Sequence, residues 1–598
     1  MTSYHRTLGS RPLDAATTEF RVWAPNHERV ALLLSDTNSC CELERDADGY
    51  FSTVASDAPA GTRYRYLVGD ERYADPASRS QPDGVHGPSQ VVDLAAHRWN
   101  DGAYSQRPLW DHVIYELHVG TYSLAGTFAG ALEYLDSLIE LGVSAVQIMP
   151  VAQFPGARNW GYDGVFPFAV QNSYGGPLAL QHFVDVCHQR GLAVILDVVY
   201  NHLGPEGNIL GRFGPYFSDR YRTPWGDAIN FDGEDSDEVR DYFWCNARQW
   251  FEDFHVDALR LDAIQSIVDP SAIPFVAELA QRSHNLGDEL DRRCDLIAES
   301  AANDPRVVTP REDNGLSMDA QWNDDFHHAL HVALTGERTG YYVDYCGVDD
   351  LARALDEGFA LQGTESPFRH RRHGAPSGHL PPDRFVVFSQ NHDQIGNRAL
   401  GDRLTTLLLP EQVRLAAALV ILSPNIPLLF MGEEYGERSP FPYFVDLSDP
   451  TLIEAVRAGR ARDFQEVAGA NRLLDPSDAT TFDMARLDHS LRDQPDNRAL
   501  FEYYEELIEI RRSTPALRRS SRSQARAWAN GNVVTLARSH DEGDVVAFFN
   551  VGASTEEANL PANGHWKILL ASTPSFESPT TFALDPWSFC VFRSAATR

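Results

Sequence analysis

The sequence predicts an α/β protein: a (β/α)8 TIM barrel preceded by a β-sandwich and followed by a compact antiparallel β domain. Its 598 residues exceed the roughly 250–300 at which a single core stops growing, so several domains are expected. Between about 106 and 521, short apolar runs alternate with helical patterns, which is typical of parallel strands covered by helices. On either side of this region, short strands are separated only by turns.

The first 105 residues carry the leading β pattern. Strands are expected at 20–23, 30–34 and 64–68, separated by clusters of turn residues. Strands this short and this regularly spaced predict a small sandwich. The proline-rich stretch 75–88 then leads to the central domain.

The central region, residues 106–521, contains eight strand candidates: 113–118, 145–150, 192–199, 257–262, 295–299, 318–322, 385–390 and 426–431. Helices are expected at 129–141 and 178–190, stopped by Gly142 and Gly191. Eight such repeats predict a closed barrel. The alternative is a doubly wound open sheet, but no G-x-G-x-x-G motif follows the first strand.

The β pattern returns after a last helix at 507–512. Strands are expected at 533–536, 545–549 and 589–592. Residues 522–598 should therefore form the antiparallel β domain.

Composition excludes several classes of partner and chemistry. The net charge of −34 argues against nucleic acid and anionic membranes, both of which attract basic surfaces. Lys567 is the single lysine, so phosphate-binding P-loops and lysine Schiff bases are not expected. The seven cysteines contain no C-x-x-C motif and are expected to be reduced and mostly buried. With no apolar run of about 18 residues and no signal-peptide pattern, we expect a soluble, cytoplasmic monomer.

Charged residues gather where the predicted barrel strands end, which is where barrel enzymes place their active sites. Arg260 and Asp262 are two residues apart on one strand and should point to the same side. A nearby guanidinium favours an ionised carboxylate, which suits a nucleophile, although an isolated pair of this kind is more often structural. Glu299 ends an apolar strand with no adjacent cation, so its pKa can rise as a general acid requires. Asp393 follows the seventh strand, and these three carboxylates predict glycosidic cleavage.

Four segments carry a resemblance to a known family: 197–202, 259–262, 297–299 and 391–393. They resemble the signature regions of the α-amylase family of glycoside hydrolases. The resemblance implies that Asp262 is the nucleophile, Glu299 the acid/base and Asp393 the stabiliser of the transition state. It also implies contacts with the cleaved sugar from four residues: Tyr162, His202, Arg260 and His392.

Longer segments at 321–328, 388–398 and 431–436 resemble the trehalose-releasing members of that family. This implies as substrate a maltooligosaccharide that ends in trehalose, contacted by Gln265, Asp324, Asp325, His327, His328, Gln394 and Asn397. Gln265 and Ser266 replace the Lys-His pair of many amylases, which suggests a different leaving group and leaves a calcium site in doubt. No metal or cofactor is expected. The alternatives are a 1,4-α-glucan branching enzyme and a non-catalytic glucan-binding protein.

Overall fold

The computed structural model describes residues 8–35, 39–223, 225–464, 473–519, 521–561, 565–572 and 581–595. Its centre is a closed barrel of eight strands that pair in parallel all the way round. In order these are β10 (Ile114–Leu117), β11 (Ala145–Ile148), β14 (Ala193–Val198), β17 (Ala258–Leu261), β18 (Asp295–Ala298), β19 (Ala320–Trp322), β22 (Phe385–Val387) and β23 (Ile426–Phe430). All eight predicted strands are confirmed.

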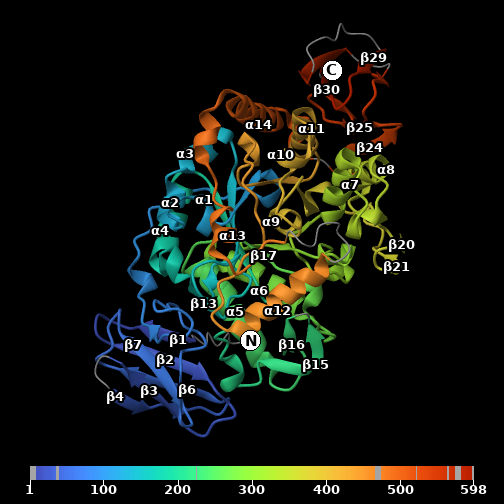
Figure 1. The fold of residues 1–598 in the computed structure, drawn as a ribbon. Coiled ribbons are helices and arrows are strands. Elements are labelled where there is room, and N and C mark those ends of the chain that lie inside the picture. The colour runs from blue at the N-terminus through green and yellow to red at the C-terminus, as the bar shows by residue number, and fades with distance from the viewer. Residues whose placement is uncertain are drawn as a thin grey trace.

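Helices surround the barrel (Figure 1). The longer ones are α4 (Gly176–Gln189), α5 (Ser236–Glu252), α6 (Phe275–Leu290), α7 (Asp324–Thr335), α8 (Val348–Glu357), α11 (Pro410–Ile421), α12 (Pro450–Asp463) and α14 (Pro495–Ser513). The predicted helix 129–141 is instead two helices, α2 (Phe128–Leu132) and α3 (Leu135–Leu141). They break at Tyr134, whose ring stacks on His489 at 3.6 Å between centroids. The short α15 (Pro515–Arg518) follows α14, so the predicted last helix is not the last.

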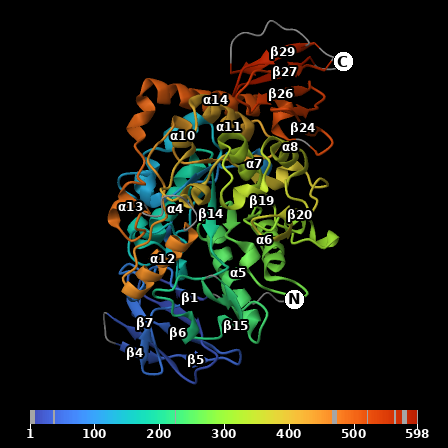
Figure 2. The same ribbon diagram turned by 45° about the vertical axis from the view of Figure 1, so that its right-hand side comes forward.

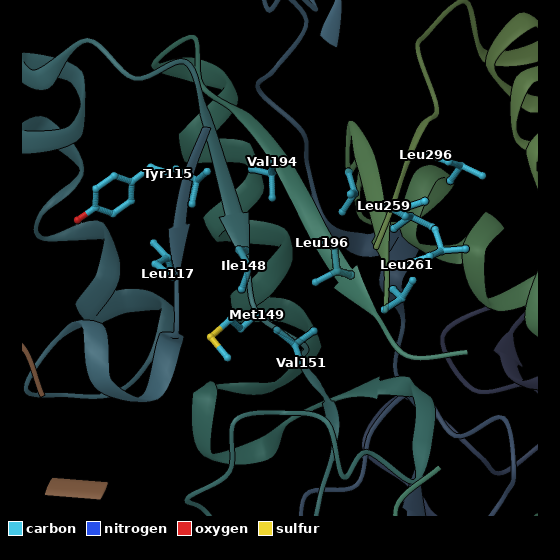
Figure 3. Packing of buried hydrophobic residues seen from close by; sticks show 14 of the residues in the cluster. Tyr115, Leu117, Ile148, Met149, Val151, Val194, Leu196, Leu259, Leu261 and Leu296 are labelled. Atoms are coloured by element: carbon cyan, nitrogen blue, oxygen red, sulfur yellow. The ribbon is translucent and has the colours of Figure 1, made fainter. Parts of the chain in front are cut away.

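Side chains of the barrel strands alternate between two cores, as strand geometry requires. One set packs outward against the helices; Figure 3 shows Tyr115, Leu117, Ile148, Leu196 and Leu259 in this outer core. The other set, which includes Ile114, Ile195, Ile297 and Trp322, fills the barrel interior. At the carboxyl ends of the strands, the side chains that point into the barrel are polar. They form the floor of the site described below.

The two β domains lie at opposite ends of the molecule (Figures 1 and 2). The N-terminal sandwich pairs β1 (Gly9–Pro12), β2 (Thr18–Trp23), β6 (Tyr50–Ala55) and β5 (Glu44–Arg45) in one sheet, and β4 (Ser39–Glu42), β3 (Val30–Leu34), β7 (Arg63–Val68), β8 (Glu71–Tyr73) and β9 (Ser89–Gln90) in the other. The C-terminal sheets contain β24 (Ala525–Asn530), β25 (Val533–Arg538), β26 (Val545–Asn550), β30 (Phe589–Ser594) and β28 (Trp566–Ala571), and then β27 (Glu556–Asn559) with β29 (Thr581–Leu584). Both β domains confirm the predicted fold class.

Three hairpins in the barrel loops were not predicted. They are β12 (Ala152–Gln153) with β13 (Phe166–Val170), β15 (Phe217–Thr223) with β16 (Gly226–Ile229), and β20 (Thr364–Ser366) with β21 (Arg371–His373). They follow the second, third and sixth barrel strands, and the turns of the last two reach the site.

All seven cysteines are free, but only Cys187, Cys294 and Cys590 are buried, so the expectation that most are buried is wrong. Cys40 and Cys41 lie on β4, an edge strand whose four residues are all exposed. No helix among the described residues is long and apolar enough to cross a membrane.

Candidate active site

Arg260 lies at the centre of a polar layer at the carboxyl ends of the barrel strands. Its side chain is fully buried, and its Nη1 donates to both carboxylate oxygens of Asp197 at 2.9 and 2.7 Å. Nη1 also donates to Asp262 Oδ1 at 3.1 Å, which confirms that Arg260 and Asp262 point to the same side of β17. The guanidinium carbon of Arg260 lies over the ring of Trp322 in the barrel interior, 4.2 Å from the ring centroid. Hydrogen bonds to the carboxylates and packing on Trp322 therefore both hold Arg260 in place.

The prediction that Glu299 has no adjacent cation is wrong. Arg260 Nη2 lies 2.9 Å from Glu299 Oε2, because Arg260 on β17 is the register partner of Ile297 on β18 and its side chain reaches across to the end of that strand. Burial nevertheless raises the pKa of Glu299; the guanidinium opposes this shift and Asp262 adds to it. The raised pKa that a general acid requires is thus present through burial.

Two neighbours orient the pair of carboxylates. Asn201 Nδ2 donates to Asp262 Oδ2 at 2.6 Å and to the backbone oxygen of Asp262 at 2.8 Å. Ala263 adopts a left-handed conformation with φ of 39°, which is strained for a residue with a Cβ. This turn lets the Ala263 N–H donate to Glu299 Oε2 at 2.7 Å. Both carboxylates are held before any substrate binds.

Asp393 and His392 begin the short helix α9 (His392–Gly396), which is capped by Asn391. Burial raises the pKa of Asp393, against the effect of His392 and with that of Glu299. The His392 Nε2 lies 2.7 Å from the hydroxyl of Tyr162, and that hydroxyl donates to Asp197 at 2.7 Å. The structure therefore brings these residues together with Arg260 in one network.

His202 forms a second edge of the site. Its Nε2 lies 3.1 Å from the backbone oxygen of Tyr162, and its ring stacks on Trp225 at 4.2 Å between centroids. Burial lowers the pKa of His202 to about 4, although Asp163 opposes this shift. Its Nδ1 lies 2.5 Å from Asn201 Oδ1, so both ring nitrogens of His202 are bound within the protein, and His202 does not line the cavity at the carboxylates.

A cavity of about 390 Å³ opens in front of the three carboxylates. Six of the residues expected at the substrate line it besides Asp262, Glu299 and Asp393: Gln265, Asp324, Asp325, His328, Gln394 and Asn397. Gln394 Nε2 donates to Asp324 at 3.3 Å, while its Oε1 has no protein partner among the described residues. Burial, followed by the charges of Glu299 and Asp393, raises the pKa of Asp324 to about 8.

Asp325 and His327 have their polar atoms bound within the protein. Asp325 accepts hydrogen bonds from Asn303, Tyr345 and the backbone N–H groups of residues 360 and 361, at 2.5–2.8 Å. His327 donates from Nδ1 to the backbone oxygen of Ser389, and its Nε2 meets the Tyr342 hydroxyl. His327 does not line the cavity at the carboxylates. Both side chains are placed to hold the loops that carry other site residues.

Sequence reasoning missed several residues of the cavity wall: Trp225, Tyr341, Tyr345, Phe368 and Arg369. Trp225 lies in the turn of the β15–β16 hairpin and is 48% exposed, which is unusual for a tryptophan. A tryptophan next to a glycine in a long loop was the available signal for it. Phe368 and Arg369 lie in the β20–β21 turn, and no sequence pattern indicated them.

No group of three or more His, Cys, Asp or Glu side chains within the described ranges has the arrangement of a metal site. The amide nitrogen of Asn201 donates to Asp262. That the enzyme needs no metal or cofactor stays a prediction.

Comparisons with known proteins agree with this geometry. Residues 7–80 match the model of carbohydrate-binding module 48 (isoamylase N-terminal domain), and residues 73–218 match the alpha-amylase catalytic domain. A crystal structure of a candidate alpha amylase from Salmonella typhimurium superposes with a TM-score of 0.91, is 38% identical, and covers 98% of this chain and 99% of its own. The barrel, its acidic layer and these matches define a glycoside hydrolase of the α-amylase family.

The curated relatives specify the family further. The malto-oligosyltrehalose trehalohydrolase of Saccharolobus solfataricus is 46% identical over 84% of this chain and 86% of its own length. The protein of that name from Mycobacterium tuberculosis (strain ATCC 25618 / H37Rv) is 41% identical over 96% of this chain and 99% of its own. The chain belongs to the malto-oligosyltrehalose trehalohydrolase family.

Proposed function

We propose that the protein hydrolyses the α-1,4-glucosidic bond between a maltooligosaccharide and its terminal α,α-trehalose, releasing trehalose. The observation that carries the proposal is the contact of one guanidinium with both Asp262 and Glu299 at the mouth of the cavity. This contact places the Asp262 carboxylate beside a cation, and it places Glu299, whose pKa is raised by burial, at the same end of the cavity. Glycoside hydrolysis requires one ionised and one protonated carboxyl group on the two sides of the bond that is cleaved. The names of the relatives give the substrate.

In this proposal Asp262 attacks the anomeric carbon and forms a glycosyl ester, while Glu299 donates its proton to the departing oxygen of trehalose. Glu299 then removes a proton from water, which displaces Asp262 and restores the original anomeric configuration. Asp393 adds negative charge beside the oxocarbenium-like transition state. Arg260 neutralises the group and keeps Asp262 directed at the substrate.

The leaving trehalose is expected against the wall formed by Asp324, His328 and Gln394. The free Gln394 Oε1 and the carboxyl of Asp324 can bond hydroxyls that a maltose leaving group presents differently. A site built on such hydrogen bonds rejects ligands that leave them unpaired. Tyr341 packs on His328 at 4.4 Å between ring centroids and stiffens this wall.

The test compares maltotriosyltrehalose with maltopentaose as substrates of the purified protein, with identification of products. We expect trehalose and maltotriose from the first, and a much lower kcat/KM for the second. Replacing both Asp324 and His328 by alanine should narrow the difference by harming the trehalose-ended substrate. Equal rates on both substrates in the parent would refute the proposal. A branching enzyme would instead change the iodine colour of amylose.

We also propose that the protein acts as a cytoplasmic monomer, with domain boundaries near 105 and 521. Support comes from the seven free thiols, since disulfides are rare in the cytoplasm. Sedimentation analysis tests the oligomeric state.

A further inference from the structure

Glu116 is a buried carboxylate for which the proposed reaction has no role. It lies on β10, outside the four segments that resemble the α-amylase family. Its neighbours on the strand, Tyr115 and Leu117, pack into the outer core (Figure 3), so Glu116 faces the barrel interior. Its exposure is 0%, and a buried carboxylate must be compensated by partners.

Both oxygens of Glu116 are bound by His392. His392 Nδ1 lies 2.8 Å from Oε1, and the His392 backbone N–H donates to Oε2 at 3.1 Å. Gln147 Nε2 on β11 also donates to Oε1, at 3.2 Å. Glu116 thus fixes both the ring and the backbone of the residue that precedes Asp393.

The other nitrogen of His392 reports on the protonation of the ring. Nε2 lies 2.7 Å from the hydroxyl oxygen of Tyr162, and the single proton of that hydroxyl is donated to Asp197. Both oxygens of Asp197 accept from Arg260 Nη1, so Asp197 is the acceptor toward Tyr162 as well, and the Tyr162 oxygen is left to accept from His392. The ring then donates from Nδ1 to Glu116 and from Nε2 to Tyr162, and only an imidazolium donates from both nitrogens.

The charges around His392 support this state. Burial alone lowers the pKa of His392, but Glu116 and then Asp393 raise it to about 9 against the opposing effect of Arg260. The titratable and charged groups facing the ring from the surrounding elements are Glu116, His118, Tyr162, Asp197, Arg260, Glu299 and Asp393. Burial lowers the pKa of His118 to about 3, so it adds no positive charge near pH 7.

We propose that Glu116 is a positioning residue that holds His392 as an imidazolium, with Nε2 available as a donor at the sugar-binding end of the site. The proposal rests on the proposed function, because it concerns the same site. When a sugar displaces the contact with Tyr162, Nε2 can donate to a hydroxyl of the sugar that is cleaved. The imidazolium also balances the charge of Asp393, whose Oδ1 lies 3.7 Å from Nε2.

The variant Glu116→Gln removes the charge of Glu116 and nearly preserves its shape. Glu434→Gln is the matched control: Glu434 is also buried and accepts from the hydroxyl of Tyr115, a residue of the same strand, but it does not contact His392. Glu116→Asp keeps the charge on a shorter side chain. The first readout is NMR of ¹⁵N-histidine-labelled protein, with His392→Asn to assign the signals of the ring.

In the parent and in Glu434→Gln, both ring nitrogens of His392 should be protonated at about pH 7.5, because the ordinary histidine pKa of about 6.5 is raised. In Glu116→Gln one nitrogen should lose its proton at this pH. A neutral His392 in the parent overturns the proposal without any variant at position 116. Protonation that persists unchanged in Glu116→Gln also overturns it.

The second readout is the ratio of kcat/KM of each variant to that of the parent, measured on maltotriosyltrehalose from pH 5 to pH 8. For Glu116→Gln the ratio should rise by about tenfold or more toward pH 5, where solvent protonates the ring. Burial raises the pKa of Glu434 to about 7, but its carboxyl bonds Tyr115 and does not line the cavity, so the ratio for Glu434→Gln should show no such rise. Glu116→Asp should retain most of the activity. A flat ratio for Glu116→Gln would leave Glu116 a purely structural residue. If the substrate assignment fails instead, the NMR result is unaffected, so the two failures are distinguishable.

Discussion

At the scale of single residues, the site depends on one buried arginine that pairs with three carboxyl groups. Arg260 contacts Asp197, Asp262 and Glu299, and the single lysine, Lys567, lies on β28 in the C-terminal domain. The rigid guanidinium fork can hold several carboxylates at fixed angles, which a flexible ammonium cannot do. Residue identities at this layer therefore determine both charge and geometry.

Replacing Asp262 by asparagine should abolish hydrolysis while leaving the fold intact. The change removes the attacking carboxylate but keeps its volume and one acceptor for Asn201. We expect a loss of about 5 kcal/mol or more of transition-state stabilisation, which is several orders of magnitude in kcat. Steady-state kinetics and a thermal melt check both parts. Activity within tenfold of the parent would remove Asp262 from the role of nucleophile.

Replacing Glu299 by glutamine should impair the donation of a proton to the leaving group. General acid catalysis contributes roughly 10²–10⁴-fold, so kcat/KM on maltotriosyltrehalose should fall by about that factor. An α-glucosyl fluoride, whose leaving group needs little acid assistance, should lose less. Comparable losses on both substrates would show that Glu299 is not the acid.

At the scale of elements, loops from several barrel strands are held together by buried acids. Asp325, at the start of α7, binds the loop after β18 through Asn303, the turn at Tyr345 and the backbone at 360–361. Tyr345 in turn accepts from His328 at 3.1 Å. Asp325 therefore shapes the cavity wall, although both of its carboxylate oxygens already accept hydrogen bonds from the protein.

Asp325→Asn should therefore destabilise the wall, because an amide has only one acceptor oxygen. Its N–H donors must face either the backbone N–H groups of 360 and 361 or the Tyr345 hydroxyl, so at least one buried donor loses its acceptor. Leaving such buried donors unpaired costs roughly 1–3 kcal/mol each. We expect a melting temperature lower by several degrees and a raised KM for maltotriosyltrehalose. The control is Asp313→Asn, at an exposed position of the short 3-10 helix Arg311–Asp313, which should leave both quantities unchanged. An unchanged melting temperature in Asp325→Asn would contradict its anchoring role.

At the scale of the whole molecule, a histidine cluster fastens the chain that leaves the N-terminal sandwich to the barrel. Asp101 Oδ2 meets His188 Nδ1 at 3.2 Å and His255 Nδ1 at 2.6 Å, and His188 Nε2 meets Asp257 at 2.9 Å. Tyr104 stacks on His188 at 4.1 Å. With an acid at each ring nitrogen, His188 is bound best as an imidazolium. Burial lowers its pKa, but Asp101 and Asp257 together raise it above the ordinary value.

The stabilisation from a raised histidine pKa is complete below the unfolded value of about 6.5 and is lost as pH rises through the folded value. Asp101→Asn should therefore cost more stability at pH 6 than at pH 9. Since hydrogen bonds to charged groups contribute roughly 1.5–3 kcal/mol, we expect a loss of about 2 kcal/mol at the lower pH. Melting curves at both values check this, with Asp136→Asn as control, because Asp136 pairs with Arg190 at an exposed site. An equal loss at both values would exclude the histidine linkage.

The sequence by itself determined features that depend on local periodicity. The eight barrel strands follow from their apolar runs, and the pairing of Arg260 with Asp262 follows from side chains alternating along a strand. Glu299 directly after β18, and Asp393 in the helix after β22, follow from their order in the chain. The chemistry of these residues and the motif resemblance were enough to indicate the family. The break at Tyr134 was missed because helical spacing continues through this residue and carries no information about its contact with the ring of His489.

Only the tertiary structure decided which distant residues meet. Glu116 touches His392 across 276 positions of sequence, and barrel closure through the pairing of β10 with β23 brings this region together. The cation beside Glu299 comes from the neighbouring strand, so strand register and not sequence adjacency sets its environment. Trp225 and Phe368 reach the cavity from hairpins with no periodic signal. Periodicity is a property of neighbouring residues, whereas contacts between loops depend on how the whole barrel closes.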